Sequence, residues 1–147
     1  MNENNITGRV YAQKVELLLR IMPIVMEEGV FAVHGGTAIN LFLKDLPRYS
    51  VDIDLTYIPL ADRKQSLDDI NLHLASICEK AKKAFKGMHI KPNYDTSKLL
   101  CEWRGKQVKV EVNQTKRGLV GGENITVPLS EKAQNEFGLY CEANIVP

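Results

Sequence analysis

Two aspartates, Asp52 and Asp54, stand one residue apart in the apolar run VDIDLTY. Aspartate is disfavoured in β-strands and is rarely buried without a partner. Because side chains alternate along a strand, the two carboxylates would share one face and lie roughly 6.5–7 Å apart. Like charges at that separation repel, and a divalent cation is the simplest compensator. Magnesium prefers such hard oxygen ligands and usually keeps water and phosphate oxygens in its shell.

A third acid, Glu111, lies in the run KVEVN between Val110 and Val112. The alternation predicts a strand in which the valines face inward and the glutamate faces outward. If this strand lies near the first, Glu111 completes a three-carboxylate magnesium site. The alternative is that all three acids are simply the solvent-facing half of amphipathic strands.

A glycine turn precedes the paired aspartates. Gly35, Gly36 and Thr37 follow the apolar run VFAVH and begin the segment TAINLFL, which has a helical pattern. A strand, a Gly-Gly turn and a helix start present free backbone N–H groups and a positive dipole end, which suits phosphate. The Thr37 hydroxyl can donate to a phosphate oxygen. The spacing of a P-loop is absent. A phosphate-binding turn followed by paired carboxylates is what metal-assisted nucleotidyl transfer requires.

Four basic residues near these motifs are further candidates. Arg48 lies beside the acids and could contact phosphate or pair with a carboxylate. Lys116 and Arg117, in a glycine-bearing segment after Glu111, could meet a triphosphate or an RNA backbone, or could be solvated. His34 precedes the glycine turn and could contact phosphate, although a histidine at a strand end also commonly serves the fold.

The elements that must position these residues alternate along the chain. A helix is expected from Gly8 to Glu28, with Thr7 as its N-cap and Pro23 near its C-terminal end. A second helix is expected from Ser66 to Lys86, with Asp68 and Asp69 in its first turn, and a short helix is expected over 37–43. Strands are expected over 30–36, 51–58, 88–94, 97–105, 107–113 and 135–147, and a loop or wide hairpin over 114–128. This order predicts an α/β fold, a mixed sheet with helices packed on it.

The totals fit one soluble domain spanning residues 1–147. Charged residues make up 25% of the chain, hydrophobic residues 44%, and the formal charge is +1, so the totals do not favour bulk attraction to nucleic acid. Three scattered cysteines are typical of reduced thiols. The N-terminus has no signal-peptide pattern and no apolar run approaches membrane-spanning length, so the cytoplasm is the expected compartment.

The segment from His34 to Tyr57 resembles the active-site signature of the AbiEii/AbiGii-type nucleotidyltransferases, toxins of bacterial abortive-infection and toxin–antitoxin systems. The matching residues are Gly35, Gly36, Thr37, Arg48, Ser50, Asp52 and Asp54. The resemblance implies a fold like the palm of DNA polymerase β, two aspartates that hold magnesium, and a Gly-Gly-Thr turn that holds the triphosphate. It also implies a third acid on a later strand, which supports Glu111.

The activity implied by the resemblance is magnesium-dependent transfer of a nucleoside monophosphate from a nucleoside triphosphate to an acceptor hydroxyl. The acceptor would be tRNA, another RNA or a protein, and a separate antitoxin protein would restrain the toxin. Two alternatives stay open: a non-catalytic nucleotide-binding module with the same fold, and an enzyme that modifies a small molecule such as an antibiotic.

One departure from the family pattern concerns the end of the sequence. Family members usually continue into a helical half with an S-x-x-x-L-x-x-x-K segment and a later R-x-x-x-R-D, and neither follows CEANIVP here. The chain is therefore expected to lack that half and to be catalytically incomplete alone. It is also expected to expose an apolar surface near its last strand that favours self-association or a partner.

Overall fold

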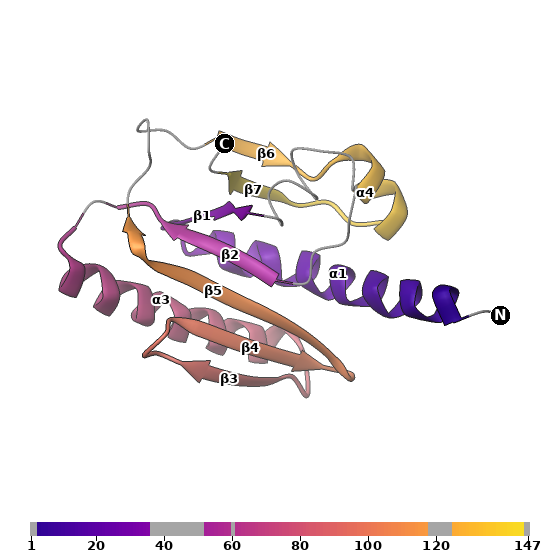
Figure 1. Cartoon of the computed structure of the whole chain (residues 1–147), viewed down its shortest axis with the longest axis horizontal. Coiled ribbons are helices and arrows are strands. Elements are labelled where there is room, and N and C mark those ends of the chain that lie inside the picture. The colour runs from indigo at the N-terminus through magenta and orange to yellow at the C-terminus, as the bar shows by residue number, and fades with distance from the viewer. Residues whose placement is uncertain (1–2, 36–51, 60, 118–124, 146–147) are drawn as a thin grey trace.

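The structure is a computed structural model that describes residues 3–35, 52–59, 61–117 and 125–145. Its described strands form one mixed seven-stranded sheet in the order β3-β4-β5-β2-β1-β7-β6 (Figure 1). The strands are β1 Phe31–His34, β2 Asp52–Tyr57, β3 His89–Asn93, β4 Lys98–Trp103, β5 Lys106–Arg117, β6 Ile125–Pro128 and β7 Glu142–Ile145. The described helices are α1 Glu3–Glu27, α3 Arg63–Ala84 and α4 Glu131–Phe137. A mixed sheet with packed helices confirms the predicted fold class.

The sheet is antiparallel except at two junctions. β2 pairs in parallel with β5, and β1 pairs in parallel with β7, whereas β1–β2, β3–β4, β4–β5 and β6–β7 are antiparallel. The antiparallel neighbours β4 and β5 are joined by a tight turn at Arg104 and Gly105, whose φ angles are both positive. Positive φ at both central residues is typical of two-residue hairpin turns, whose twist matches that of the flanking strands.

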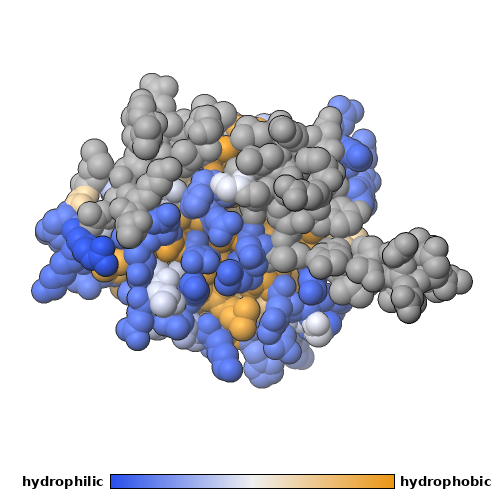
Figure 2. Space-filling view, viewed as in Figure 1, coloured by the Kyte–Doolittle hydropathy of each residue, from blue (hydrophilic) through white to orange (hydrophobic). Residues whose placement is uncertain are grey.

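The helices α1 and α3 contact each other and pack on one face of the sheet (Figure 1). The inward side chains of β2 and β5, including Ile53, Leu55, Val108 and Val110, are fully buried against them. The outward side chains of the same strands lie on the face that α1 and α3 do not cover. That open face, toward the viewer in Figures 1 and 2, is largely hydrophilic where it is described.

Two predicted helix starts were wrong. α1 begins at Glu3, so Thr7 lies inside it, and Pro23 does not end it because the helix continues to Glu27. Burial of the neighbouring Met22 and Val25 in the core offsets the hydrogen bond that proline removes. α3 begins at Arg63 after Asp62, whose carboxylate accepts a hydrogen bond from the Gln65 N–H at 2.8 Å. An N-cap at Asp62 moves Asp68 and Asp69 out of the first turn.

The predicted strand over 135–147 was also wrong in part. Its beginning belongs to α4, which Ser130 caps by accepting from the Ala133 N–H, and which ends at Gly138 in the left-handed region. Serine and glycine at these two ends are ordinary helix-cap signals. The predicted loop over 114–128 is shorter than expected, because β5 continues to Arg117 and β6 begins at Ile125. The predicted helix over 37–43 lies outside the described residues.

The described surface carries three large exposed apolar side chains, Leu72, Tyr94 and Tyr140. They come from α3, from the turn before β4 and from the segment before β7, so a continuous apolar surface near β7 stays a prediction. No helix in the described part of the chain combines the length and the apolar character needed to cross a membrane. The three cysteines are buried and free, and burial raises the pKa of the Cys101 thiol to about 12.

A buried carboxylate joins the end of α1 to α3. The Glu28 side chain is 4% exposed and accepts hydrogen bonds from Ser76 Oγ at 3.0 Å and Lys80 Nζ at 2.6 Å. Its other oxygen lies 2.8 Å from His73 Nδ1. Burial acts to raise the pKa of Glu28, but the hydrogen bonds from Lys80, His73 and Ser76 outweigh it, so the net pKa is lowered.

We predict that Glu28→Gln lowers the free energy of unfolding by about 1–3 kcal/mol at pH 7, because it removes charge-assisted hydrogen bonds in a buried position. A lowered carboxyl pKa contributes stability above the unfolded-state pKa and loses it as pH falls through the folded-state value. The difference between wild type and variant should therefore shrink below about pH 4.5. Urea unfolding across pH measures it. Glu27→Gln is the matched control, because Glu27 is 66% exposed and lies 3.8 Å from the same lysine.

Candidate active site

Four ionisable residues form one row across the open face of the sheet. His34 on β1 pairs in register with Asp54 on β2, Asp54 pairs with Glu111 on β5, and Glu111 pairs with Lys98 on β4. Neighbouring strands lie about 4.8 Å apart, so Asp54 and Glu111 are adjacent. The two predicted carboxylates thus share one face, as the alternation along each strand predicts.

A second row lies next to the first. Asp52 on β2 pairs with Lys109 on β5, and both are on the same face as Asp54 and Glu111 because side chains two apart point the same way. The Lys109 ammonium is 3.8 Å from Asp52 Oδ2 and 3.4 Å from Glu111 Oε2. On the other side, Lys98 Nζ is 3.7 Å from Glu111 Oε1. Two lysines therefore balance two of the three carboxylates.

The third carboxylate, Asp54, has no lysine within 4 Å among the described ion pairs. Burial raises the pKa of Asp54 most, His34 opposes this rise, and the negative charges of Asp52 and Glu111 add to it. Lys109 lowers the same pKa by a smaller amount. The pKa of Lys109 itself is raised, chiefly by Asp52. Burial and the two neighbouring carboxylates thus together disfavour the ionised form of Asp54.

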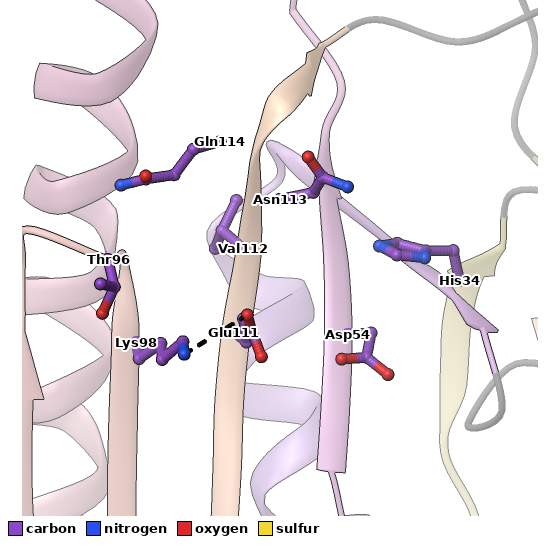
Figure 3. A pocket seen from close by; sticks show the side chains of 8 residues that line it. All are labelled: His34, Asp54, Thr96, Lys98, Glu111, Val112, Asn113 and Gln114. Atoms are coloured by element: carbon purple, nitrogen blue, oxygen red, sulfur yellow. Dashed lines mark ion pairs between the residues drawn. The ribbon is translucent and has the colours of Figure 1, made fainter.

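The first row, His34, Asp54, Glu111 and Lys98, lines a cavity of about 410 Å³ on the open face. In Figure 3, Lys98 reaches toward Glu111, and His34 and Asn113 approach β2 from its two sides. The residues that line the cavity are His34, Asp54, Thr96, Lys98, Glu111, Val112, Asn113 and Gln114. Most of them are polar or charged, so the cavity suits a charged ligand better than an apolar one.

The rim of the cavity beside β4 is fixed by hydrogen bonds to the preceding turn. Gln114 Nε2 donates to the Asp95 carbonyl at 2.8 Å and to Ser97 Oγ at 3.1 Å. The Val112 N–H donates to the Ser97 carbonyl at 3.0 Å. Ser97 is buried and has a φ of 53°, so the turn holds an unusual conformation that places Thr96 and Lys98 at the cavity.

The glycine turn begins directly beside the acids. Gly35 follows His34 and has a φ of +71°, and a Cβ atom at this position would lie 3.4 Å from Asp54 Oδ2. Glycine permits the positive φ, whereas a Cβ atom at that distance would make ordinary van der Waals contact with the carboxylate. This contact brings the start of the predicted phosphate-binding turn to the carboxylate row.

The other predicted phosphate contacts are only partly placed. Gly36, Thr37, Arg48 and Ser50 lie outside the described residues. The backbones of Lys116 and Arg117 belong to the end of β5, where Arg117 pairs with Tyr57, and not to a loop as predicted. The two basic residues therefore follow Glu111 on the same strand.

Sequence reasoning missed the lysines of the site. Lys109 precedes Glu111 by two residues, so the alternation that identified the glutamate also places the lysine on its face. Lys98 gives no such signal, because its position opposite Glu111 depends on the pairing of β4 with β5. Thr96, Asn113 and Gln114 likewise reach the cavity through strand pairing and the turn before β4.

The carboxylates of Asp52, Asp54 and Glu111 are the donor set that could hold magnesium, since that ion prefers carboxylate and water oxygens. Among the residues that the structure describes, however, no three His, Cys, Asp or Glu side chains lie close enough together to hold one metal ion. The register places the three carboxylates on one face, and the lysines hold two of them in ion pairs.

We predict that Asp54→Asn increases the free energy of unfolding of the metal-free protein at pH 7. A carboxyl group with a raised pKa in the folded state is destabilising when ionised, and amidation removes that charge. The gain should be about 0.5–1 kcal/mol for a partly exposed group and should disappear as pH falls below the ordinary aspartate pKa of about 3.8. Chemical unfolding in a chelating buffer measures it. A less stable variant at pH 7 would contradict the interpretation that burial and the neighbouring carboxylates make the ionised Asp54 destabilising.

Comparison with known proteins gave a match to a protein family. The family model described as "Nucleotidyl transferase AbiEii toxin, Type IV TA system" matches residues 16–138. Neither the curated proteins nor the solved structures gave a match. The matched segment begins in α1, contains the carboxylates and the glycine turn, and ends just after α4. It covers far more than half of the chain, and it agrees with the resemblance noted in the sequence. The chain belongs to the AbiEii family of nucleotidyltransferase toxins.

Proposed function

We propose that this protein transfers a nucleoside monophosphate from a nucleoside triphosphate to an acceptor hydroxyl in a magnesium-dependent reaction. The observation that carries the proposal is the cross-strand pairing of Asp54 with Glu111, next to a turn that starts at Gly35. Family membership supports the reaction class. In the reaction, the acceptor oxygen bonds to the α-phosphorus, the bond from that phosphorus to the bridging oxygen breaks, and pyrophosphate leaves.

Each part of the site has a proposed role. Asp52, Asp54 and Glu111 would hold Mg²⁺, which when bound neutralises charge on the triphosphate. The backbone N–H groups of the turn that starts at Gly35, together with the Thr37 hydroxyl, would bind phosphate oxygens. Arg48, Ser50, Lys116 and Arg117 are proposed as additional phosphate contacts (from the sequence signature and their position on the chain). Holding donor and acceptor in line would supply much of the rate.

The acceptor and the cellular partner are also proposals. We propose an RNA acceptor, with tRNA as the first candidate and a protein hydroxyl as the second, and a separate antitoxin protein as the inhibitor. The description of the family as a toxin of a type IV system supports the antitoxin. The polar lining of the cavity, with Lys98 and His34 at its two ends, supports an anionic nucleotide.

We predict that Asp52→Asn combined with Asp54→Asn lowers pyrophosphate release by at least about a thousandfold, because it removes the charges that hold the cation. The assay supplies each nucleoside triphosphate in turn, with bulk tRNA or with cytosolic protein as the acceptor. Asp68→Asn, an exposed acid on α3, is the matched control and should leave the rate unchanged.

The same assay separates the proposed function from its alternatives. Nucleotide binding without pyrophosphate release, whatever the acceptor, would identify a non-catalytic binding module or a chain that is catalytically incomplete alone. Release that requires an aminoglycoside instead of RNA or protein would identify an enzyme that modifies small molecules. Equal rates for wild type and the double variant would contradict the assignment of the carboxylates.

A second prediction compares two glycines with similar backbone conformations. Gly35 and Gly29 have φ angles of +71° and +76°, but only at Gly35 would a Cβ atom meet the Asp54 carboxylate; at Gly29 it meets nothing within 4 Å. Each substitution by alanine should cost about 1–2 kcal/mol of stability, because an L-residue is strained there. Gly35→Ala should also weaken nucleotide binding by about tenfold, whereas Gly29→Ala should not. Calorimetric titration with a nucleoside triphosphate and thermal unfolding measure the two effects. Equal affinities would mean that Gly35 serves the turn alone.

A further inference from the structure

A cation of the chain itself already lies between two of the three carboxylates on the open face, Asp52 and Glu111. The Lys109 ammonium lies 3.8 Å from Asp52 Oδ2 and 3.4 Å from Glu111 Oε2, whereas no three metal-binding side chains are close enough to hold an ion in the described part of the chain. A lysine that contacts two carboxylates from neighbouring strands stands where a divalent cation would bridge them. The same geometry explains why the ligands share a face without gathering around a common point.

The position of Lys109 is set by the sheet. It is two residues before Glu111 on β5 and opposite Asp52 on β2, so it lies on the same face as both carboxylates. Its side chain is 38% exposed, and its stem has four carbons, so the ammonium group can swing away without unfolding of the strand. Lys98 differs because, among the residues that the structure describes, it pairs with one carboxylate, Glu111, at 3.7 Å.

We propose that Lys109 is a positioning residue that acts as a resident counter-cation: it pairs with Asp52 and Glu111 while the site holds no metal and withdraws when a divalent cation binds. The inference rests on the proposed function, because it assumes that these carboxylates are the metal ligands. It adds that the metal must compete with an ammonium group of this chain. Lys109 would therefore both stabilise the metal-free protein and weaken its affinity for the metal.

An ordinary surface ion pair would behave differently. Exposed pairs contribute roughly 0.2–1 kcal/mol each and have no necessary effect on a nearby ligand. A resident counter-cation has opposite effects in the two states, because removal of its charge destabilises the metal-free protein and favours the metal-bound one. Both effects should weaken at high ionic strength, where exposed charges are screened.

The test measures metal binding by the full chain without nucleotide. Mn²⁺ binding is followed by electron paramagnetic resonance, with Mg²⁺ as competitor, and thermal unfolding is recorded in a chelating buffer and in excess Mg²⁺. We expect Lys109→Met to tighten Mn²⁺ binding by about three- to tenfold, as the loss of two partly exposed ion pairs implies. It should also lower the melting temperature in the chelating buffer and enlarge the rise caused by Mg²⁺.

Two variants make the test specific. Lys109→Arg keeps the positive charge and should bind Mn²⁺ like the wild type. Lys91→Met removes the same charge from the same face and should also bind like the wild type, because Lys91 on β3 is separated from Lys109 by Leu100 of β4. Lys91 makes no ion pair with any of the residues that the structure describes.

The outcomes separate this inference from the proposed function. If Mn²⁺ binds to the wild type and not to the variant with Asp52→Asn and Asp54→Asn, but Lys109→Met changes nothing, the role of Lys109 is overturned and the metal site stands. If Lys109→Arg or Lys91→Met tightens binding as much as Lys109→Met, the resident counter-cation is also overturned. Absence of saturable Mn²⁺ binding by the wild type would overturn both the proposed function and this inference.

Discussion

The site depends on one constraint, the register of the parallel pair β2 and β5. Ile53 and Leu55 on β2 and Val110 and Val112 on β5 are buried under the helices, and the pairing sets Ile53 against Val110 and Leu55 against Val112. A slip of one residue would turn a strand's apolar side chains toward solvent and its carboxylates into the core. The same burial that stabilises the fold therefore holds Asp54 opposite Glu111, and no separate interaction is needed to align them.

The charges on the open face destabilise the metal-free fold at Asp54, whose ionised form is disfavoured by burial and by the neighbouring carboxylates. Three carboxylates and two lysines occupy adjacent positions on three strands, and Asp54, which neither lysine contacts within 4 Å in the described ion pairs, has a raised pKa. A sheet selected for stability alone would use alternating opposite charges or polar uncharged residues here. Functional sites commonly retain such unfavourable charge because the ligand supplies the compensation. Elsewhere, by contrast, both oxygens of the buried Glu28 carboxylate have partners, His73 on one side and Ser76 and Lys80 on the other.

Much of the fold and part of the candidate site could be predicted from local patterns. Strict alternation identified β2 and the central part of β5, and it placed Asp52, Asp54 and Glu111 on outward faces before the pairing was known. Helix starts were predicted less well, although Asp62 and Ser130 are ordinary N-cap residues: each accepts a hydrogen bond from the backbone N–H three residues later. Lys98 could not have been identified, because its place beside Glu111 depends on a pairing between strands that the sequence does not encode locally. The glycine-turn signature beyond Gly35 lies outside the described residues and rests on sequence alone.

The antiparallel pairing of β1 with β2 explains how the two sequence motifs come together. His34 is the last residue of β1 and pairs with Asp54, so the chain leaves β1 at the level of the carboxylate row, and Gly35 is the next residue. The distance between the start of the glycine turn and the acids is thus fixed by strand pairing and not by the residues between the two motifs. Insertions or deletions between 36 and 51 would leave Gly35 beside Asp54 as long as both strands kept their buried faces. The place of Gly35 beside Asp54 therefore depends on the short β1, on β2 and on the pairing of these two strands.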